Sequence, residues 1–281
     1  MAQTRKPTWR SVRLGQDLRR IREKAGLGSL EVAEQLGWDR SKVSRIENAK
    51  VYVTPADVEA MLDLYGANTP TKSSLLTLAK EAGKRGWWTA YGDVFGGSYV
   101  DMEDLAAEID DWETQVVPGL LQTPEYARKI IRTTLASAPD EEIERRLRAR
   151  MARKPVLHRA EPPKLHAVLD EAVLRRIQGD AEVFRGQVRA LLEAPPNVVV
   201  QMLPFRAGWN AGMDGPCVVL KFAKDLGPSK AYVDSAAGDV YVESVEGVQR
   251  CTFVFEAVKQ AALSPEETAK WLGAQLKDQA T

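Results

Sequence analysis

Histidine and cysteine are scarce in this chain of 281 residues, which contains two of each. Neither His158 nor His166 has a second ligand at a spacing typical of zinc sites, so no metal site is expected. Cys217 and Cys251 have no neighbouring histidine, so neither thiol is expected to act as a nucleophile. Two cysteines far apart in the sequence are typical of a reducing compartment, and the expected location is the cytoplasm.

Long apolar segments and phosphate-binding loops are missing as well. No stretch of about 18 uncharged apolar residues is present, so no membrane span is expected. The charged N-terminal residues are not followed by an apolar segment, which argues against a secretory signal. No P-loop, dinucleotide-binding glycine motif or G-x-S-x-G nucleophile motif occurs. These absences argue against an enzyme, and no cofactor is expected.

Charge is distributed unevenly, although the formal net charge is zero. Residues 1–50 contain twelve Lys or Arg against six Asp or Glu, whereas residues 89–125 contain nine acidic residues and no Lys or Arg. The basic end suggests contact with nucleic acid. Solvated helix faces of opposite sign explain the same composition equally well, so the motifs must decide.

Three short helices are predicted in the basic part of the chain. Apolar residues recur at helical spacing over residues 11–24, and a second helix is predicted over residues 30–36. Gly37 then tolerates the positive φ that a tight turn needs. Asp39 is the predicted N-cap of a third helix over residues 40–48. This succession is that of a helix-turn-helix.

The sequence LEVAEQLGWDRSKVSRIEN at residues 30–48 resembles the helix-turn-helix of the phage-repressor-like (XRE) family. Its small, glycine and apolar positions match together, at Ala33, Gly37, Val43 and Ile46. The resemblance covers residues 9–67 and implies a bundle of five helices, with the fourth at residues 54–65 and the fifth at residues 72–84.

The resemblance also implies an ion pair between Arg22 and Glu47 that joins the first helix to the third. We expect this pair to hold the third helix in place rather than to contact DNA. The family tends to have glycine after the Glu-Asn of the third helix, whereas this chain has Ala49. The glutamine with which the family contacts phosphate is replaced by Ser29.

In such a fold the third helix lies in the DNA major groove, with its N-terminal residues at the base edges. Arg40, Ser41 and Lys42 are predicted to occupy that first turn. Arg40 and Arg45 are the predicted base readers, because one arginine can donate two hydrogen bonds to guanine and discriminate by ~1–3 kcal/mol. The predicted phosphate contacts are Ser29, Lys42, Asn48 and Lys50, and Ser44 completes the predicted interface.

A second domain is predicted at residues 87–281, after a helix-turn-helix domain at residues 1–86. Segments rich in β-branched and aromatic residues predict strands at 165–170, 198–204, 217–223, 231–234 and 240–243. Helices are predicted at 102–114, from 123, and at 141–158, 171–178, 181–193, 245–262 and 265–277. The expected fold class is α+β overall: an all-α five-helix domain followed by a larger α+β domain with a mostly antiparallel sheet.

Four motifs occur in order in this second part: WETQVVPGLLQTPEYAR, LDEAVLRR, VVVQMLPFRAGWNAGMDGP and VYVE. Together they resemble the uncharacterised C-terminal domain attached to helix-turn-helix regulators of actinobacteria, over residues 95–277. The resemblance implies a regulator of development or secondary metabolism. Such regulators are often encoded beside a small partner protein that binds them.

Two features of the second part favour recognition of a ligand or partner. The glycine-rich loop at residues 204–216 could cover a ligand pocket or present Trp209 to a partner, although a structural loop explains it equally well. A basic helix face that includes Arg146 and Arg150 could dock an acidic partner or the acidic segment of a second subunit. A solvated helix face explains these arginines too.

The sequence therefore predicts a transcriptional regulator that binds double-stranded DNA. A homodimer is expected, because a single helix-turn-helix buries little DNA and two half-sites are the usual solution. Control by a ligand or a small protein partner is expected through the second domain. The alternative is an interaction module that sequesters a small partner protein, with DNA binding secondary.

Overall fold

The computed structural model describes residues 8–83, 87–91, 94–95, 98–177, 179–223 and 226–278. The chain forms two compact units. The first consists of Met1–Leu105 and Phe222–Pro228, and the second of Ala106–Lys221 and Ser229–Thr281.

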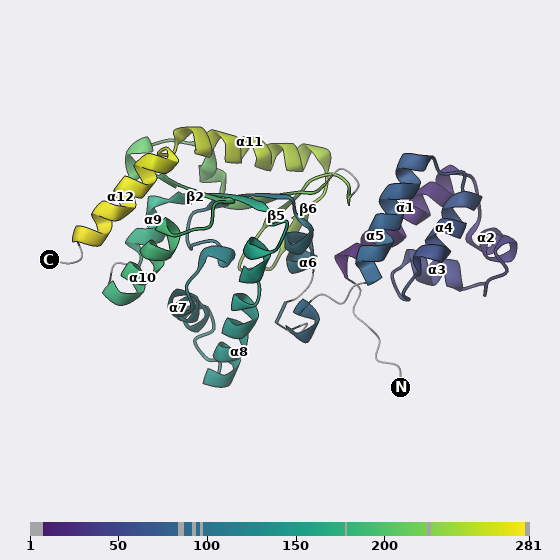
Figure 1. Ribbon diagram of the computed structural model, residues 1–281, viewed down its shortest axis with the longest axis horizontal. Coiled ribbons are helices and arrows are strands. Elements are labelled where there is room, and N and C mark those ends of the chain that lie inside the picture. Colours follow the sequence, from purple (N-terminus) through teal and green to yellow (C-terminus); the bar gives the residue numbers. More distant parts are fainter. Residues whose placement is uncertain are drawn as a thin grey trace. The chain divides into compact units, whose positions relative to one another are not determined.

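The first unit contains the five expected helices, drawn in purple and blue in Figure 1. They are α1 (Trp9–Lys24), α2 (Ser29–Gln35), α3 (Lys42–Glu47), α4 (Pro55–Leu64) and α5 (Thr69–Gly83). Their apolar faces meet in one core, in which Leu18, Val43 and Met61 are fully buried. The last residue predicted for the fifth helix, Lys84, lies outside the described residues.

The fourth helix begins as its sequence predicts. The Thr54 side chain accepts a hydrogen bond from the Asp57 backbone N–H at 3.1 Å, and the Asp57 carboxylate accepts one from the Thr54 N–H at 3.4 Å. Pro55 occupies the first helical position, where its missing N–H costs nothing. This reciprocal cap fixes the start of α4.

The first unit continues beyond residue 86, through a 3-10 turn at Trp87–Tyr91 and α6 (Ser98–Leu105). Arg10 on α1 explains the extension. Its Nε lies 2.7 Å from Asp101 Oδ1 and its Nη2 lies 2.7 Å from Asp104 Oδ2, both on α6. Arg10 and Asp101 are 3% and 1% exposed, so α6 is tied to α1 by a buried ion pair.

The second unit has a mixed six-stranded sheet, and the expectation of a mostly antiparallel sheet is wrong. The strands are β1 (Glu108–Glu113), β2 (Lys164–Asp170), β3 (Val198–Leu203), β4 (Cys217–Lys221), β5 (Lys230–Val233) and β6 (Val240–Val242). Their order is β3-β2-β1-β4-β5-β6. The pairs β1–β2 and β2–β3 are parallel, whereas β1–β4, β4–β5 and β5–β6 are antiparallel.

The prediction of one helix over residues 102–114 is wrong, because that segment ends α6 and forms β1. β1 lies between β2 and β4, and its four central residues are buried. Asp110 lies in this strand, and its Oδ2 is 2.6 Å from the Nζ of Lys221 on β4. A lysine on a neighbouring strand that is distant in the sequence thus stabilises this carboxylate in the middle of the sheet.

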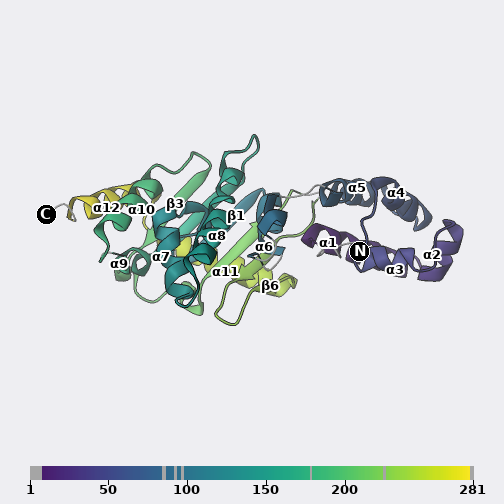
Figure 2. The ribbon, with the colours of Figure 1, turned by 90° about the horizontal axis from the view of Figure 1, so that it is seen from below.

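Helices cover both faces of this sheet. α7 (Pro124–Thr134) and α8 (Asp140–Met151) lie on one side and α11 (Val245–Ala261) on the other (Figure 1), and α7 and α8 lie in front of the strands in Figure 2. The predicted helix over 141–158 ends at Met151 and is followed by a 3-10 turn at Lys154–His158. α9 (Glu171–Arg175), α10 (Ala181–Leu192) and α12 (Pro265–Asp278) complete the unit.

The parallel pairings follow from these helices. Strands β1 and β2 are connected through α7 and α8, and β2 and β3 through α9 and α10. Parallel neighbours require such long crossovers. The core between α11 and the sheet contains Trp112 of β1 and Phe255 and Val258 of α11, all 1% exposed or less. No helix in the described ranges is long and apolar enough to cross a membrane.

Candidate nucleic-acid interface

A buried ion pair fixes α3 against α1, as expected. Arg22 Nε lies 2.6 Å from Glu47 Oε1, and Arg22 Nη2 donates to Glu47 Oε2 at 2.9 Å. Arg22 Nη1 also donates to the Leu27 carbonyl at 2.8 Å, in the connection to α2. The hydrogen bond to Glu47 raises the pKa of Arg22. One guanidinium therefore joins three elements of the motif.

A glycine that sequence reasoning missed lets these helices approach. An added Cβ on Gly15 of α1 would lie 2.5 Å from the Glu47 carbonyl oxygen and 2.8 Å from that of Ile46. Real Cβ atoms are not found so close to backbone oxygens, so this position requires glycine. A glycine inside an otherwise amphipathic helix was the available signal.

The turn between α2 and α3 places the candidate base readers. Gly37 has a φ of 65°, and the Trp38 N–H donates to the Ala33 carbonyl at 2.7 Å. Asp39 Oδ1 then accepts hydrogen bonds from the Ser41 backbone N–H at 3.0 Å and from the Ser41 hydroxyl at 2.5 Å. These bonds lower the pKa of Asp39. The prediction of Asp39 as the N-cap of this helix is wrong: the N-cap of α3 is Ser41, and the Asp39 side chain closes the turn before the helix instead.

The third helix begins at Lys42, two residues later than predicted. Arg40 and Ser41 therefore lie in the turn that precedes α3 rather than in its first turn. The Asp39–Ser41 hydrogen bonds hold this turn outside the regular helix. Arg40 is exposed, and its side chain makes no hydrogen bond or ion pair with the part of the chain that the structure describes. Its guanidinium is available to a ligand.

Two predicted DNA contacts are bound to carboxylates of the first unit. Lys42 Nζ lies 2.8 Å from Asp57 Oδ1 and 3.7 Å from the centroid of the Trp38 ring. Arg45 Nη2 lies 3.2 Å from Asp39 Oδ1, and both of these side chains are exposed. An exposed pair contributes little to stability, so DNA can replace the Asp39 contact of Arg45. Lys42 is held more firmly, between α4 and an indole.

The remaining predicted contacts surround the same surface. Asn48 Nδ2 donates to the Ser44 carbonyl at 2.7 Å, which caps the last turn of α3, and both side chains are exposed. Ala49 follows with a φ of 52°, the backbone for which the family resemblance implies glycine. Lys50 is exposed, and Ser29 is half-buried at the start of α2.

The two arginines predicted for a docking face on α8 have different surroundings. Arg146 Nε lies 2.5 Å from Glu142 Oε1, one helical turn away. Arg150 is half-buried and donates to Gln122 Oε1 at 2.8 Å. Burial lowers the pKa of Arg150 to about 10. Both guanidinium groups therefore already have partners within the second unit.

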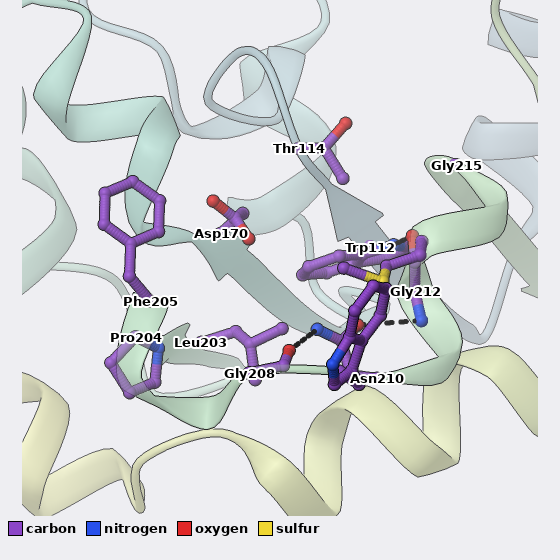
Figure 3. Close-up of a pocket in the computed structure, with 12 residues that line it drawn as sticks. Trp112, Thr114, Asp170, Leu203, Pro204, Phe205, Gly208, Asn210, Gly212 and Gly215 are labelled. Carbon is purple, nitrogen blue, oxygen red and sulfur yellow. Dashed lines mark hydrogen bonds between the residues drawn. The ribbon is translucent and has the colours of Figure 1, made fainter.

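Trp209 lies in the loop between β3 and β4 and is 92% exposed. It lines a cavity of about 510 Å³ together with Trp112, Asp170 and Phe205. Figure 3 shows Phe205 on one side of this space and Trp112 on the other, with Asp170 between them. The loop that the sequence singled out therefore borders a hollow in the second unit.

His158 is exposed, whereas His166 and the two cysteines are buried or half-buried in the second unit. His166 Nε2 is 2.6 Å from Gln201 Oε1, and burial lowers the pKa of this imidazole. The Cys217 thiol is 3.8 Å from the Cys251 carbonyl, and burial raises its pKa to about 12. Within the described residues, no cluster of three or more His, Cys, Asp or Glu side chains could hold a metal ion.

Two protein families match the chain. A helix-turn-helix domain matches residues 13–75, and a helix-turn-helix suggests DNA binding and a regulatory role. A domain of unknown function, DUF5753, matches residues 97–274. No curated protein matches the chain. The DUF5753 match covers more than half of the chain, so the chain belongs to the DUF5753 family.

Proposed function

We propose that the protein is a transcriptional regulator that binds DNA in a sequence-specific manner through a helix-turn-helix of the XRE type. One observation carries the proposal: the turn before α3 presents an unpaired Arg40 beside a helix that the Arg22–Glu47 pair holds in place. In helix-turn-helix proteins, the N-terminal end of the recognition helix meets the base edges in the major groove.

The residues on the surface around α3 have two roles, contact with bases and contact with phosphates. Arg40 and Arg45 read bases, and Arg45 exchanges its exposed Asp39 contact for a base on binding. Ser41 and Ser44 complete the surface at the bases. The phosphate contacts, which set the register without reading sequence, are Ser29, Lys42, Asn48 and Lys50.

We also propose that the protein is a dimer and that the second part of its chain is regulatory. Two copies bind two half-sites about one helical turn apart, because one recognition helix covers too little DNA for a specific complex. Residues 1–86 supply the DNA contacts, and residues 87–281 receive the signal, which is a ligand or a small protein partner. The regulators that the second part of the chain resembles are those of actinobacteria.

The test starts from selection of binding sites, because the operator is unknown. The full chain is incubated with random DNA duplexes, and the enriched sequence serves in gel-shift titrations. Arg40→Ala is expected to lose the preference for the enriched sequence and to keep its fold by circular dichroism. One good arginine–guanine pair is worth ~1–3 kcal/mol, so the loss is about tenfold or more.

Arg189→Ala is the matched control, because it removes the same charge from an exposed arginine on α10. It is expected to bind the enriched sequence like the unchanged protein. The role of Arg40 is wrong if Arg40→Ala binds that sequence with unaltered affinity and preference.

The alternative function is an interaction module that sequesters a small protein. The 92% exposure of Trp209 favours it, since an exposed indole is a common anchor at protein interfaces. Selection that enriches no sequence, together with a small protein retained in equal amount on purification, would replace the regulator by this alternative.

A further inference from the structure

One loop of the second unit concentrates exposed apolar side chains around a hollow. Phe205, Trp209 and Met213 are 58%, 92% and 63% exposed, and all three line the cavity of about 510 Å³. They make up three of the nine large apolar side chains that are exposed among the described residues. Scattered exposed apolar residues are ordinary, but several around one concave surface mark a binding site.

The cavity lies at the carboxyl ends of the three parallel strands. Thr114 follows β1, Asp170 ends β2 and Leu203 ends β3, and all three line it. Figure 3 shows Asp170 and Thr114 at the ends of two neighbouring strands. Parallel strands bring their carboxyl ends to one edge of a sheet, where α/β proteins commonly bind small ligands.

The loop that carries the exposed side chains is itself firmly built. Trp112 Nε1 donates to the Gly212 carbonyl at 3.2 Å, and an added Cβ at Gly212 would lie 2.6 Å from the Trp112 ring. Asn210 donates to the Gly208 carbonyl at 2.9 Å and accepts from the Gly212 N–H at 2.9 Å. The backbone is thus fixed on the indole of Trp112, while Trp209 between these anchors stays uncovered.

The charge of the lining restricts the ligand. Asp170 is the one ionisable residue among the described residues that line the cavity, which include no Lys or Arg. Its Oδ1 accepts the Ala172 N–H at 2.8 Å and caps α9. Its Oδ2 accepts no hydrogen bond from the described part of the chain. An anion would meet the Asp170 carboxylate there, whereas a cation or an N–H donor would pair with its free oxygen.

We propose that this cavity binds a small planar aromatic molecule that carries a protonated amine, with its ring against Trp209 and its amine at Asp170. The size agrees, because cavities of about 300–1,000 Å³ hold molecules of this kind. Aromatic stacking and the attraction of a cation for an indole both favour such a ligand. The inference rests on the ligand control in the proposed function and names the chemistry of the ligand.

Two probes that share an indole ring test the assignment on the full chain in the absence of DNA. Tryptamine carries an amine that is protonated at neutral pH, and indole-3-propionate carries a carboxylate. Calorimetric titration is expected to show one saturable tryptamine site per chain and binding of indole-3-propionate about tenfold weaker or more. No DNA is needed, so failure here is separate from failure of the DNA selection.

Variants assign the two contacts. Trp209→Ala is expected to weaken tryptamine binding about tenfold, and Trp209→Phe to restore most of it by keeping an aromatic ring. Asp170→Asn is expected to remove the preference for tryptamine over indole-3-propionate. Asparagine caps a helix as well as aspartate does, so α9 keeps its start in this variant.

Phe253→Ala is the control, because Phe253 is a 57% exposed aromatic residue on α11 that does not line the cavity. It is expected to leave both titrations unchanged. The proposal is overturned by no saturable tryptamine binding up to about 10 mM, by equal binding of the two probes, or by an unchanged affinity in Trp209→Ala.

Discussion

A methyl group at position 15 would collide with the chain at the end of α3. The nearest atoms to that methyl would be the carbonyl oxygens of Glu47 and Ile46, at 2.5 and 2.8 Å. Both are backbone atoms, so no side-chain rotation relieves the collision and α1 and α3 must separate. The Arg22–Glu47 pair, which spans the same two helices, would be stretched by that separation.

Gly15→Ala is therefore expected to destabilise the first unit by about 1–3 kcal/mol, the usual cost of overpacking. Urea unfolding measures the change, and gel shifts with the selected DNA should show weaker binding. Gly186→Ala on α10 is the control, since nothing lies within 4 Å of its added Cβ and alanine favours a helix. If Gly15→Ala is as stable as the unchanged protein, α1 and α3 separate at no cost in free energy and the prediction is wrong.

At the scale of an element, α3 depends on its surroundings for its position. It has six residues, and isolated helices shorter than about 12–15 residues are not stable in water. Burial of Val43 and Ile46 holds one side of the helix. The Asp39–Ser41 hydrogen bonds hold its start, and with it the turn that carries Arg40.

Asp39→Ala is expected to keep the fold and to lose discrimination between selected and unrelated DNA. The reason is that the turn before α3 loses its acceptor, while removal of a negative charge near DNA does not weaken non-specific attraction. Asp39→Asn keeps an acceptor oxygen and should retain discrimination. Competition gel shifts measure the ratio, and an undiminished ratio in Asp39→Ala would remove Asp39 from this positioning role.

The same hydrogen bonds give the turn a dependence on pH. They lower the pKa of Asp39 in the folded protein relative to the unfolded chain. The stabilisation is therefore present above the unfolded pKa and is lost as the pH falls through the folded value. Asp39→Asn removes this titrating group. The free energy of unfolding of this variant should therefore fall less steeply as the pH is lowered through that range.

Elements with local signals were predictable, and elements fixed by distant partners were not. α4 follows from its Thr-Pro start and β4 from its β-branched residues. β1 was missed because its acidic residues favour a solvated helix, and Lys221, which neutralises Asp110, lies on another strand. The two helical patterns between residues 170 and 198 could have predicted the parallel pair β2–β3, because antiparallel neighbours do not need them.

In the candidate nucleic-acid interface, too, contacts between segments distant in the sequence could not be predicted. The Arg22–Glu47 pair followed from a family resemblance, and the exposure of Arg40 agrees with its expected place on the surface. The contact of Lys42 with Asp57 and Trp38 depends on how α4 packs on α3, which no local pattern reveals. The loop with Trp209 could be named from the sequence as a cover for a pocket, but the opposite wall could not, because Trp112 belongs to β1, whose acidic residues favour a helix.

On the scale of the whole molecule, the chain passes through the first unit twice. Residues 222–228, which connect β4 to β5, belong to the first unit. Phe222 stacks on Trp9 of α1 with ring centroids 5.3 Å apart and 21° between the planes, and Leu226 packs against the core of the bundle. The helical bundle therefore contacts a segment far along the chain.

Phe222→Ala in the full chain is expected to destabilise the bundle by about 2 kcal/mol. This is less than the ~3–5 kcal/mol of a fully buried phenylalanine, because Phe222 is half-buried. Hydrogen exchange of the α1 amides should quicken accordingly, whereas Phe253→Ala on α11 should leave it unaltered. Equal α1 exchange in Phe222→Ala and the unchanged protein would mean that the bundle is stable without this segment.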